Sequence, residues 1–353
     1  MKNFFGCDAH KKYSMFASIN EEGHRAHCIK VKNDRHQFRC FLNTLPPGSP
    51  IAVETVGNWY WMIDDMERAG HVPKLANAWK AKLMMGQINK TDKLDANGLA
   101  LLLRNGTLPS VWIPPKELRD QRELPRMRMA LVSVRTKFKN RIHATLAKYS
   151  IQITEVSDIF GVRGRTLIKE RLSELPPHTR RSVETQLELL DQTVEHIKVC
   201  EKQIDEVIKK TPAIKLLMTL PGVGPVLAIV IALEIGEVKR FARAENLASY
   251  AGTVPRISES AGRTRYGRVR PDVNRYLKWA LIEAANTVVM NQSRWSDQRH
   301  VARLYRRIRG RRGHAKAVVA VARHLAEASY WVLKKNESYK EPKRYEPISS
   351  TQK

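Results

Sequence analysis

The stretch "NKTDKLDANGLALLLRNG", residues 89–106, places two aspartates at the start of an apolar run that has the pattern of a helix. Asp92 and Asp95 are three residues apart, so on a helix both side chains lie on the same face. Thr91 is a residue type that caps helix N-termini, which makes helix capping one interpretation of this stretch. A metal site is the other interpretation, and the residues elsewhere in the chain decide between the two.

The residues before this helix alternate between strand and helix signals. Short strands are indicated by "NFFGCDAH", "YSMFASI", "HCIKVKN", "PIAVETVG" and "HVPKLAN". Helices are indicated by "DRHQFRCFLNTL", with Asp34 near its N-cap, by "NWYWMIDDMERAG", which Gly70 ends, and by "AWKAKLMMG". Three strands followed by alternating helices and strands predict an α/β domain over residues 1–110.

Two further acids lie inside predicted strands of this domain. Asp8 is flanked by apolar and small residues in "FFGCDAH", and Glu54 lies in "IAVETV". A carboxylate in an apolar strand is costly unless a cation neutralises it, and a divalent metal does this well. Two Mg²⁺ ions about 3.5–4 Å apart can activate a nucleophile and stabilise the leaving oxygen in phosphodiester cleavage. A strand Asp, a strand Glu and a helical Asp pair together predict an RNase H-like nuclease core.

His10 lies two residues after Asp8 and would share its face of the strand. One interpretation of this histidine is a role beside the metal or on a phosphate. We favour the other interpretation, a solvent-exposed histidine at the end of the strand, because histidine is commonly exposed in folded proteins.

The composition indicates a nucleic-acid partner. Lys and Arg number 62 against 35 Asp and Glu, which gives a formal net charge of +27, and a surplus of this size favours binding to a polyanion. The hydrophobic content of 42% is ordinary for a globular protein. No run of 18 apolar residues and no signal-peptide pattern is present, so we expect a soluble cytoplasmic protein with no membrane partner. The cysteines form no C-x-x-C pair and are expected to be reduced thiols: Cys7, Cys28, Cys40 and Cys200.

Residues 111–210 have the pattern of long helices. Residues 116–149, after the breaker "PSVWIPP", are predicted to form one long basic helix. Residues 178–210 carry a heptad seam over about four heptads. Seven of its eight positions are apolar: Val183, Leu187, Leu190, Val194, Ile197, Glu201, Ile204 and Ile208. The seam could pair with residues 116–149, pair with another subunit as a coiled coil, or pack as one amphipathic helix on its own domain.

Residues 211–335 are predicted to be mainly helical, with two loops of interest. The first, "LPGVG", places Gly222 and Gly224 before an apolar helix. It either presents backbone N–H groups to a phosphate, as a helix-hairpin-helix does, or simply separates two helices. The second, "VPRISESAGRTRYGRVR", is a loop rich in glycine, serine and arginine that suits phosphate binding. Its arginines are Arg256, Arg263, Arg265, Arg268 and Arg270.

Three other features of this half bear on function. The run "RRIRGRR" is a solvated or nucleic-acid-binding patch, formed by Arg306, Arg307, Arg309, Arg311 and Arg312. Ser260 lies among the loop arginines, but a serine hydroxyl is a poor nucleophile unless cations or a metal activate it. By residue type alone it is an exposed loop serine, and Tyr250 and Tyr266 are rival nucleophiles. The polar residues 336–353 are expected to be a disordered tail.

The motifs "GCDAH", "AVETVG" and "KTDKLDA" resemble the three acidic motifs of the DEDD-type insertion-sequence transposases, the IS110 family with its IS1111 branch, which are related to the Piv-type DNA invertases. The stretch from "LPGVGPVLAIV" to "RYLKWALIEAA" resembles that family's C-terminal transposase domain. The two halves occur in the family's order, and the match covers nearly the whole chain except the tail. The resemblance implies a RuvC-like RNase H domain in residues 1–110, a helical coiled-coil region in 111–210 and a mainly helical, serine-bearing transposase domain in 211–335.

The resemblance also implies a site and its partners. The family serine corresponds to Ser260, followed here by Ala261 where the family has glycine. A noncoding bridge RNA in this family specifies both the double-stranded target and the donor DNA. A homotetramer, formed as a dimer of dimers, would bring the acids of one subunit to the serine of another. The protein would lie in the bacterial cytoplasm and would associate with the nucleoid when active. The family acids correspond to Asp8, Glu54, Asp92 and Asp95. They would bind two Mg²⁺ ions, or Mn²⁺ instead of Mg²⁺.

Three functions are compatible with these features. A recombinase would cut and rejoin DNA through a covalent intermediate on Ser260, with the acids and Mg²⁺ assisting. A RuvC-like junction-resolving nuclease would hydrolyse DNA with the acids alone, but it needs no second domain of this size. A non-enzymatic nucleic-acid binder should have lost one or more of the acids, and all four are present. We therefore predict a site-specific DNA recombinase of an insertion sequence, with the hydrolytic nuclease as the alternative.

Overall fold

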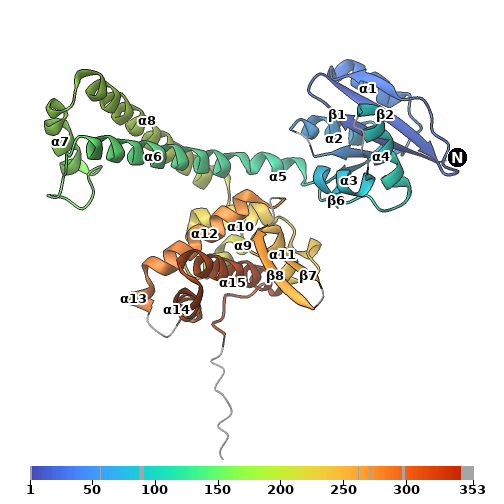
Figure 1. Ribbon diagram of the computed structural model, residues 1–353. Helices are drawn as coiled ribbons and strands as arrows, with labels where there is room; N and C mark the ends of the chain where they lie inside the picture. The colour runs from blue at the N-terminus through green and yellow to red at the C-terminus, as the bar shows by residue number, and fades with distance from the viewer. Residues whose placement is uncertain are drawn as a thin grey trace, which may run out of the picture. The chain divides into compact units, whose positions relative to one another are not determined.

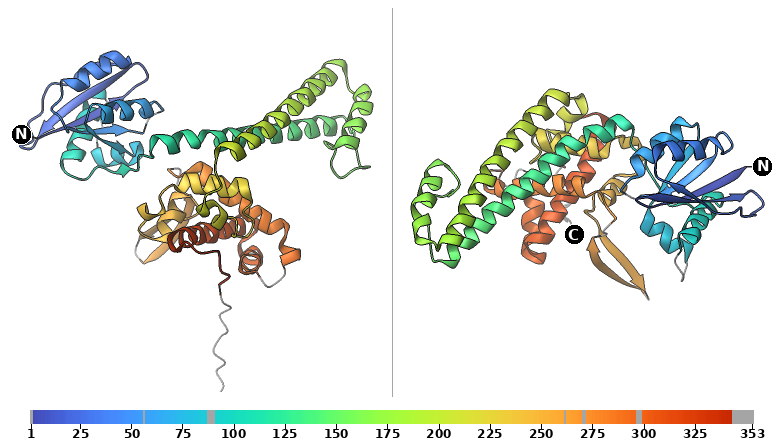
Figure 2. Two further views of the ribbon diagram at one scale, coloured as in Figure 1. Left: turned by 180° about the vertical axis from the view of Figure 1, so that it is seen from behind. Right: turned by 90° about the horizontal axis from the view of Figure 1, so that it is seen from above.

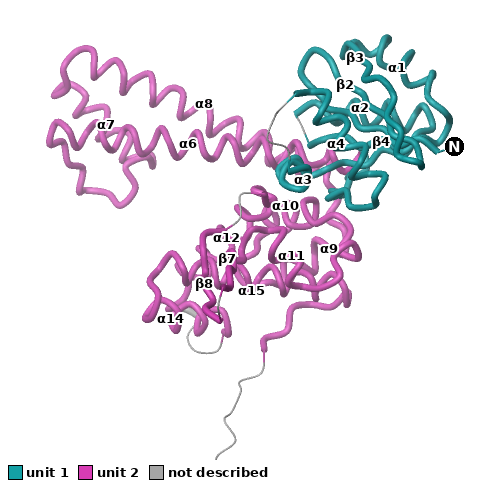
Figure 3. The backbone as a smooth tube through the Cα atoms, turned by 45° about the vertical axis from the view of Figure 1, so that its right-hand side comes forward, with its two compact units in different colours: residues 1–116 teal, residues 117–353 magenta. Residues whose placement is uncertain are grey.

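The chain forms two compact units, Met1–Lys116 (unit 1) and Glu117–Lys353 (unit 2), shown in Figure 3. Unit 1 is a mixed α/β fold, whereas unit 2 is almost entirely helical (Figure 1). The computed structural model describes residues 2–55, 57–86, 91–260, 262–269, 272–295 and 299–342.

Unit 1 is built on a six-stranded sheet with the strand order β3-β2-β1-β4-β5-β6. β1 is antiparallel to β2 and parallel to β4, and β4 is parallel to β5, so the carboxyl ends of β1 and β4 meet at the same end of the sheet. The five predicted strands are confirmed, the short β6 is an addition, and the sheet is compatible with an RNase H-like fold. The strands are β1 (Asn3–Ala9), β2 (Tyr13–Asn20), β3 (Ile29–Lys32), β4 (Pro50–Glu54), β5 (Val72–Ala76) and β6 (Ser110–Val111).

Helices cover both faces of this sheet. On one face, Phe38 of α1 (Arg35–Asn43) and Met62 of α2 (Trp59–Arg68) share a core with the strands. On the other face, Leu99 of α4 (Asp92–Arg104) packs with Ala52 of β4 and Ala81 of α3 (Ala78–Met85). Burial of these apolar faces is the main favourable term for folding. The apolar face of α4 packs against the sheet, and this packing fixes the position of the acids in the first turn of α4.

The predicted helix caps are confirmed in this unit. The Asp34 side chain accepts a hydrogen bond of 3.0 Å from the Gln37 amide, and Thr91 accepts one of 3.3 Å from the Leu94 amide. Gly70 follows α2 with a φ of +78°, a left-handed conformation that glycine adopts at little cost. Thr91 is thus a cap, which leaves Asp92 and Asp95 available for another role.

Unit 2 begins with two long helices, α6 (Glu123–Lys148) and α8 (Pro177–Val207), which lie side by side in both views of Figure 2. The short α5 (Lys116–Gln121) precedes α6, so the single helix predicted for residues 116–149 is interrupted near Arg122. The far end of the pair is covered by α7 (Val162–Arg171) and the 3-10 turn η1 (Leu172–Glu174).

The heptad seam of α8 packs inside its own chain. Leu187 shares a core with Ile142 of α6, and Ile204 joins the core of the C-terminal helices. Glu201, the charged seam position, is paired, because its Oε1 lies 2.6 Å from Nη2 of Arg128 on α6. Of the alternatives for the seam, the structure shows pairing with the preceding basic helix. A second subunit is therefore not needed to bury it.

The rest of unit 2 is a bundle of helices around one large core. Helix α10 is apolar on all sides except at Glu234 and is largely buried, as such helices are in globular proteins. Among the described residues no helix combines the length and apolarity needed to span a membrane. The elements are α9 (Pro212–Leu217), α10 (Pro225–Ile235), η2 (Val238–Arg240), α11 (Ala244–Tyr250), β7 (Pro255–Ser260), β8 (Arg263–Val269), α12 (Arg275–Met290), α13 (Gln292–Trp295), α14 (His300–Arg312) and α15 (His314–Lys335).

A buried carboxylate ties α6 to the C-terminal helices. Glu234 is 1% exposed, and its two oxygens accept hydrogen bonds of 2.8 and 3.1 Å from Nε and Nη2 of Arg126. The Asn274 side chain donates a third bond of 2.8 Å to Glu234. A buried charge needs such partners to offset its desolvation. The sequence pattern contains no indication of this network.

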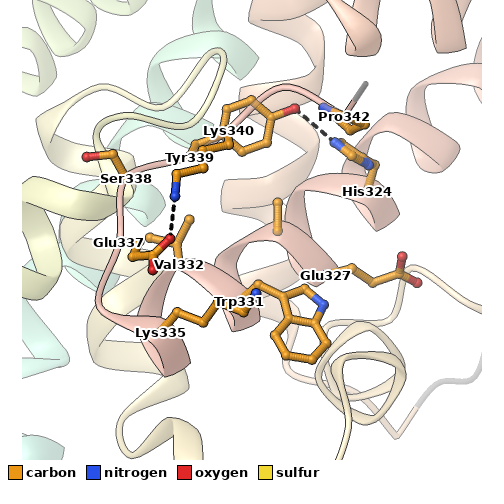
Figure 4. A pocket seen from close by; sticks show the side chains of 11 residues that line it. His324, Glu327, Trp331, Val332, Lys335, Glu337, Ser338, Tyr339, Lys340 and Pro342 are labelled. Atoms are coloured by element: carbon orange, nitrogen blue, oxygen red, sulfur yellow. Dashed lines mark hydrogen bonds and ion pairs between the residues drawn. The ribbon is translucent and has the colours of Figure 1, made fainter. Parts of the chain in front are cut away.

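The chain after α15 packs back onto unit 2. The Tyr339 amide donates a hydrogen bond of 2.8 Å to Thr219 Oγ1, and the Tyr339 hydroxyl lies 3.1 Å from His324 Nε2. A small pocket lies between this segment and α15 (Figure 4). The expected disorder from residue 336 is therefore wrong for residues 336–342, and the later part of the tail lies outside the described residues.

Candidate functional site: acids at the strand ends and an arginine hairpin

The register of β1 and β4 places two of the predicted acids side by side. Cys7 pairs with Val53 across the parallel strands, and Asp8 and Glu54 are the next residue on each strand. Cys7 and Val53 belong to the core beneath α1 and α2. Because successive side chains of a strand point to opposite faces, Asp8 and Glu54 point to the face that α4 covers.

A glycine brings α4 close to β1. A first side-chain carbon at Gly6 would lie 2.0 Å from the Ala96 carbonyl oxygen and 2.6 Å from the Ala100 amide nitrogen. Only glycine therefore lets the two backbones approach this closely. The contact sets the N-terminus of α4, with Asp92 and Asp95, beside the carboxyl end of β1.

Three side chains meet at this point. Nε2 of His10 lies 3.1 Å from Oδ2 of Asp8 and 3.3 Å from Oδ2 of Asp92. The Tyr13 hydroxyl donates a hydrogen bond of 2.7 Å to the same Asp92 oxygen. The candidate ligand atoms of Asp8, His10 and Asp92 all lie within 4.8 Å of one another. Of the four predicted acids, the structure therefore brings Asp8 and Asp92 together directly.

The other two acids act on the same region through their charge. Burial raises the pKa of Asp8 above its ordinary value, and the charges of Asp95 and Asp92 add to this while His10 opposes it. Burial also raises the pKa of the Cys7 thiol, with the charges of Asp8 and Glu54 adding to the effect. Cys7 therefore stays a neutral thiol, and the charges of Asp95 and Glu54 reach Asp8 and its neighbour Cys7, respectively.

Asp92 differs from Asp8 in its electrostatics. The hydrogen bond from Tyr13 is the main cause that lowers the pKa of Asp92, and His10 acts in the same direction. The ionised form of Asp92 is therefore stabilised, whereas burial destabilises the ionised form of Asp8. Two neighbouring carboxylates in different environments are typical of sites that bind cations or move protons.

The described residues fit a divalent ion at this point. Asp8 is 6% exposed, and within the described part of the chain neither its Oδ2 nor His10 Nε2 makes a hydrogen bond. Buried polar atoms without such partners are costly, and a metal ion would satisfy both. Carboxylate oxygen and imidazole nitrogen are both common ligands of divalent ions.

The structure corrects the interpretation of His10 in part. The side chain is 37% exposed, as expected for the end of a strand, but its Nε2 atom is buried between two carboxylates. The cause is the tight turn after β1, in which the His10 amide donates a hydrogen bond of 2.9 Å to the Tyr13 carbonyl. Asn33 and Asn58 add bonds of 2.6 and 3.0 Å to the His10 carbonyl oxygen. Tyr13 and the two asparagines carry no sequence signal of this role, because they meet only in three dimensions.

The predicted arginine loop in unit 2 is a β-hairpin. Residues 255–269 form the antiparallel strands β7 and β8, with Gly262 at a φ of +73° in the turn, so the prediction of an irregular loop is wrong. Ser260 pairs directly with Arg263, and Ser258 pairs with Arg265. Opposite residues of such a pair share one face, so each serine has an arginine beside it.

The rival nucleophiles differ in their surroundings. Ser260 is exposed on its strand, and Tyr266 on the partner strand is 72% exposed. The hydroxyl of Tyr250 instead accepts a hydrogen bond of 2.9 Å from Asn274, and the guanidinium of Arg240 lies over its ring. Tyr250 is therefore a packed residue. Ala261 and Arg270 lie outside the described residues.

The glycines of the "LPGVG" turn have different roles. A first side-chain carbon at Gly222, whose φ is +78°, would lie 2.3 Å from the Ala284 carbonyl oxygen of α12, so this glycine is required for packing. Gly224 is the exposed N-cap of α10, with no atom within 4 Å of such a carbon. Phosphate binding by this turn stays a prediction.

The cationic run occupies the C-terminal part of α14 (Figure 1). Exposed cations on a helix end suit contact with a phosphate backbone. Their contact with nucleic acid stays a prediction, as does that of Arg256 and Arg268 at the base of the hairpin. The exposed members of the run are Arg306, Arg307, Arg309, Arg311 and Arg312.

Comparison with known families covers both units. The IS110-type DEDD model, described as "Transposase", matches residues 5–151. The model described as "Transposase IS116/IS110/IS902 family" matches residues 214–301. The first match contains all four predicted acids and the second contains Ser260, so the fold and the two matches define a DNA transposase of the DEDD type. The chain belongs to the IS110 family of these transposases.

Relatives align with this chain over most of its length. A "Probable family 20 transposase" from Pseudomonas aeruginosa is 25% identical over 87% of this chain and 90% of its own. The "Transposase for insertion sequence element IS1328" from Yersinia enterocolitica is 24% identical over 89% and 91%. The "Transposase for insertion sequence element IS1111A" from Coxiella burnetii is 24% identical over 95% and 90%. The enzyme class, a DNA transposase that uses a divalent metal, follows from this family.

Proposed function

We propose that this transposase is a site-specific recombinase, which cuts and rejoins DNA through a covalent bond to Ser260. Asp8, Glu54, Asp92 and Asp95 would hold its catalytic ions, for which two Mg²⁺ are the proposal. The observation that supports the metal site best is the meeting of Asp8 and Asp92, with the unsatisfied Asp8 Oδ2, at the end of β1.

Ser260 supplies what hydrolysis lacks. Its oxygen would attack the scissile phosphorus, the P–O bond to the departing strand would break, and the proton of the serine would pass to solvent as the departing oxygen gains one. The phosphoserine bond conserves the energy of the broken linkage until another DNA end attacks it. Arg263, directly opposite Ser260 on the partner strand, is the arginine that we propose to neutralise charge on the phosphate. Arg256, four residues from Ser260 on the same strand, would contact a more distant part of the DNA.

The acids have a separate task. Bound divalent ions would supply Lewis acidity toward the phosphate and its leaving oxygen. Asp92 is held ionised by Tyr13, and Asp8 is fixed on a central strand. The acids belong to unit 1 and Ser260 to unit 2, which accords with the composite site that the family resemblance implies.

Partners follow from charge and family. A chain with a formal net charge of +27 can bind DNA and RNA at the same time. The proposed partners are the target and donor DNA and a bridge RNA that specifies both, and the proposed location is the nucleoid. A homotetramer would unite acids and serine of different subunits. Since the seam of α8 is buried within its own chain, we assign the contacts between subunits to other surfaces.

The test compares strand cleavage with rejoining. Asp8→Asn should abolish both reactions, because a metal ligand is removed. Ser260→Ala should bind DNA normally but give no recombinant, whereas Ser258→Ala, which changes the neighbouring serine on the same exposed strand, should keep most activity. Recombination on a plasmid substrate and nicking of labelled duplexes are the two measurements.

Two outcomes would contradict the proposal. Recombination by Ser260→Ala at the rate of the unaltered chain would remove the serine from the mechanism. Unchanged nicking by Ser260→Ala, with Asp8→Asn inactive, would instead support the hydrolytic nuclease, because the acids would then cut DNA without the serine.

A further inference from the structure

We propose that His10 is itself a ligand of the divalent ion at the Asp8 site, and that its nitrogen makes this site prefer Mn²⁺ to Mg²⁺. This inference rests on the metal site proposed above. It adds a fifth residue to the four acids and assigns the identity of the ion. It starts from the position of one atom, His10 Nε2, between two carboxylate oxygens.

The distances fit ligands of one ion. Nε2 lies 3.1 Å from Asp8 Oδ2 and 3.3 Å from Asp92 Oδ2. An octahedral ion with bonds of about 2.1 Å separates neighbouring ligands by about 3.0 Å. Nε2 therefore lies from each carboxylate oxygen at the spacing of adjacent corners around one small cation, and all three atoms lie within 4.8 Å of one another.

The surroundings hold the histidine in this position. Its carbonyl oxygen accepts hydrogen bonds from Asn33 and Asn58, and its ring lies 4.8 Å from the ring of Tyr13. The Tyr13 hydroxyl also fixes Asp92 through a bond of 2.7 Å. Supporting contacts of this kind orient the ligands of metal sites.

The competing explanation for the position of His10 is that its protonated ring neutralises the two carboxylates in the absence of a metal ion. Such a cation would donate its Nε2–H to one of the carboxylates. In the described residues Nε2 lies at ion-pair distance from both acids, without the alignment of a hydrogen bond to either. A ligand that shares an ion with both carboxylates has this spacing, and a protonated ring would form ion pairs of the same length. The two explanations predict opposite effects of removing the ring.

The nitrogen ligand decides the choice of ion. Sites made only of carboxylate and water oxygens suit Mg²⁺, whereas imidazole suits transition metals. Mn²⁺ accepts both ligand types and resembles Mg²⁺ in its chemistry with phosphates. A site with Asp8, Asp92 and His10 should therefore bind Mn²⁺ more tightly than Mg²⁺, and the preference should depend on His10.

The experiment measures metal binding by the full-length, metal-free chain at a fixed pH, without DNA. Mn²⁺ is titrated and the free ion is counted by electron paramagnetic resonance, and Mg²⁺ affinity is obtained by competition. His10→Ala should weaken Mn²⁺ binding about tenfold or more, and Mg²⁺ binding by a smaller factor. His24→Ala is the matched control, because His24 lies 3.2 Å from Glu22 but on an exposed turn of the same unit.

Pulsed resonance gives a second readout. Bound Mn²⁺ should show modulation from a coordinated ¹⁴N nucleus in the unaltered chain and in His24→Ala, and should lose it in His10→Ala. His10→Gln, which keeps a polar side chain of similar length, should lose it too. Circular dichroism confirms that each variant is folded.

The outcomes separate this inference from the proposed function. Tighter or unchanged Mn²⁺ binding by His10→Ala, or ¹⁴N modulation that persists in it, would overturn the inference alone. If the unaltered chain binds Mn²⁺ no better than Asp8→Asn, the metal site of the proposed function fails as well.

Discussion

Replacing Gly6 with alanine adds one methyl group where α4 crosses β1. The new carbon would lie 2.0 Å from the Ala96 carbonyl oxygen, and an ordinary contact begins at 3.4 Å. Because the obstacle is backbone, α4 must move away by about 1.4 Å to restore such a contact. The shift carries Asp92 and Asp95 away from Asp8.

Two magnitudes follow from this movement. Overpacking of this kind costs about 1–3 kcal/mol of stability. A displacement of about 1 Å at reacting groups costs about 100-fold in rate. We therefore expect Gly6→Ala to lower the free energy of unfolding of unit 1 by about 1–3 kcal/mol and to slow metal-dependent strand cleavage about 100-fold.

The assay combines urea unfolding with cleavage of a labelled duplex. Gly57→Ala is the control, because a methyl group there has no atom within 4 Å, and it should change stability by less than about 0.5 kcal/mol. A Gly6→Ala protein as stable and as active as the unaltered chain would refute the reasoning, since α4 would then not depend on this close approach.

Three further predictions concern charge and packing. The raised pKa of Asp8 means that the folded state stabilises its protonated form, and this contribution disappears as pH rises through the folded pKa. Metal-free Asp8→Asn should therefore be more stable than the unaltered chain at pH 7, and a lower urea midpoint would contradict this. Leu190→Ala, at a fully buried seam position, should cost about 2–5 kcal/mol, whereas Leu189→Ala, 40% exposed, should cost less than about 0.5 kcal/mol; equal losses in thermal unfolding would show that the seam is not a core. Replacing the five exposed arginines of α14 by glutamine should weaken DNA binding. The slope of the logarithm of the binding constant against the logarithm of the salt concentration should fall in magnitude by about 0.9 for each DNA phosphate that is no longer neutralised, and an unchanged slope would place the DNA-binding surface elsewhere. The five are Arg306, Arg307, Arg309, Arg311 and Arg312.

Local patterns in the sequence carry most of unit 1. Thr91 and Asp34 begin their helices as predicted, because a cap depends on residues within one turn. Asp8 and Glu54 are recognisable because a charge inside an apolar strand demands a partner. That Asp8 and Glu54 lie side by side depends on the parallel pairing of β1 with β4, which the sequence pattern does not predict.

Features that depend on tertiary contacts escape sequence reasoning. His10 looks like an exposed residue until the turn after β1 places its ring between Asp8 and Asp92. Tyr13 contacts Asp92 across 79 residues of chain. The role of such residues depends on neighbours that no local pattern identifies.

The arginine hairpin escapes for a different reason. Its strands are exposed on both faces, so they lack the alternation of apolar and polar residues that marks a half-buried strand. Glycine, serine and arginine are the usual composition of a loop. The cross-strand pair Ile257 and Tyr266 is an apolar signal that favours a hairpin there.

The most direct test of the account is the identity of the residue that becomes bonded to DNA. Full-length protein is incubated with bridge RNA, divalent metal and a nicked substrate that prevents rejoining, and the trapped adduct is digested and sequenced by mass spectrometry. We expect DNA on Ser260, with no adduct from Ser260→Ala or Asp8→Asn. DNA on Tyr266, Tyr250 or Ser258, or no adduct under any trapping condition, would contradict it.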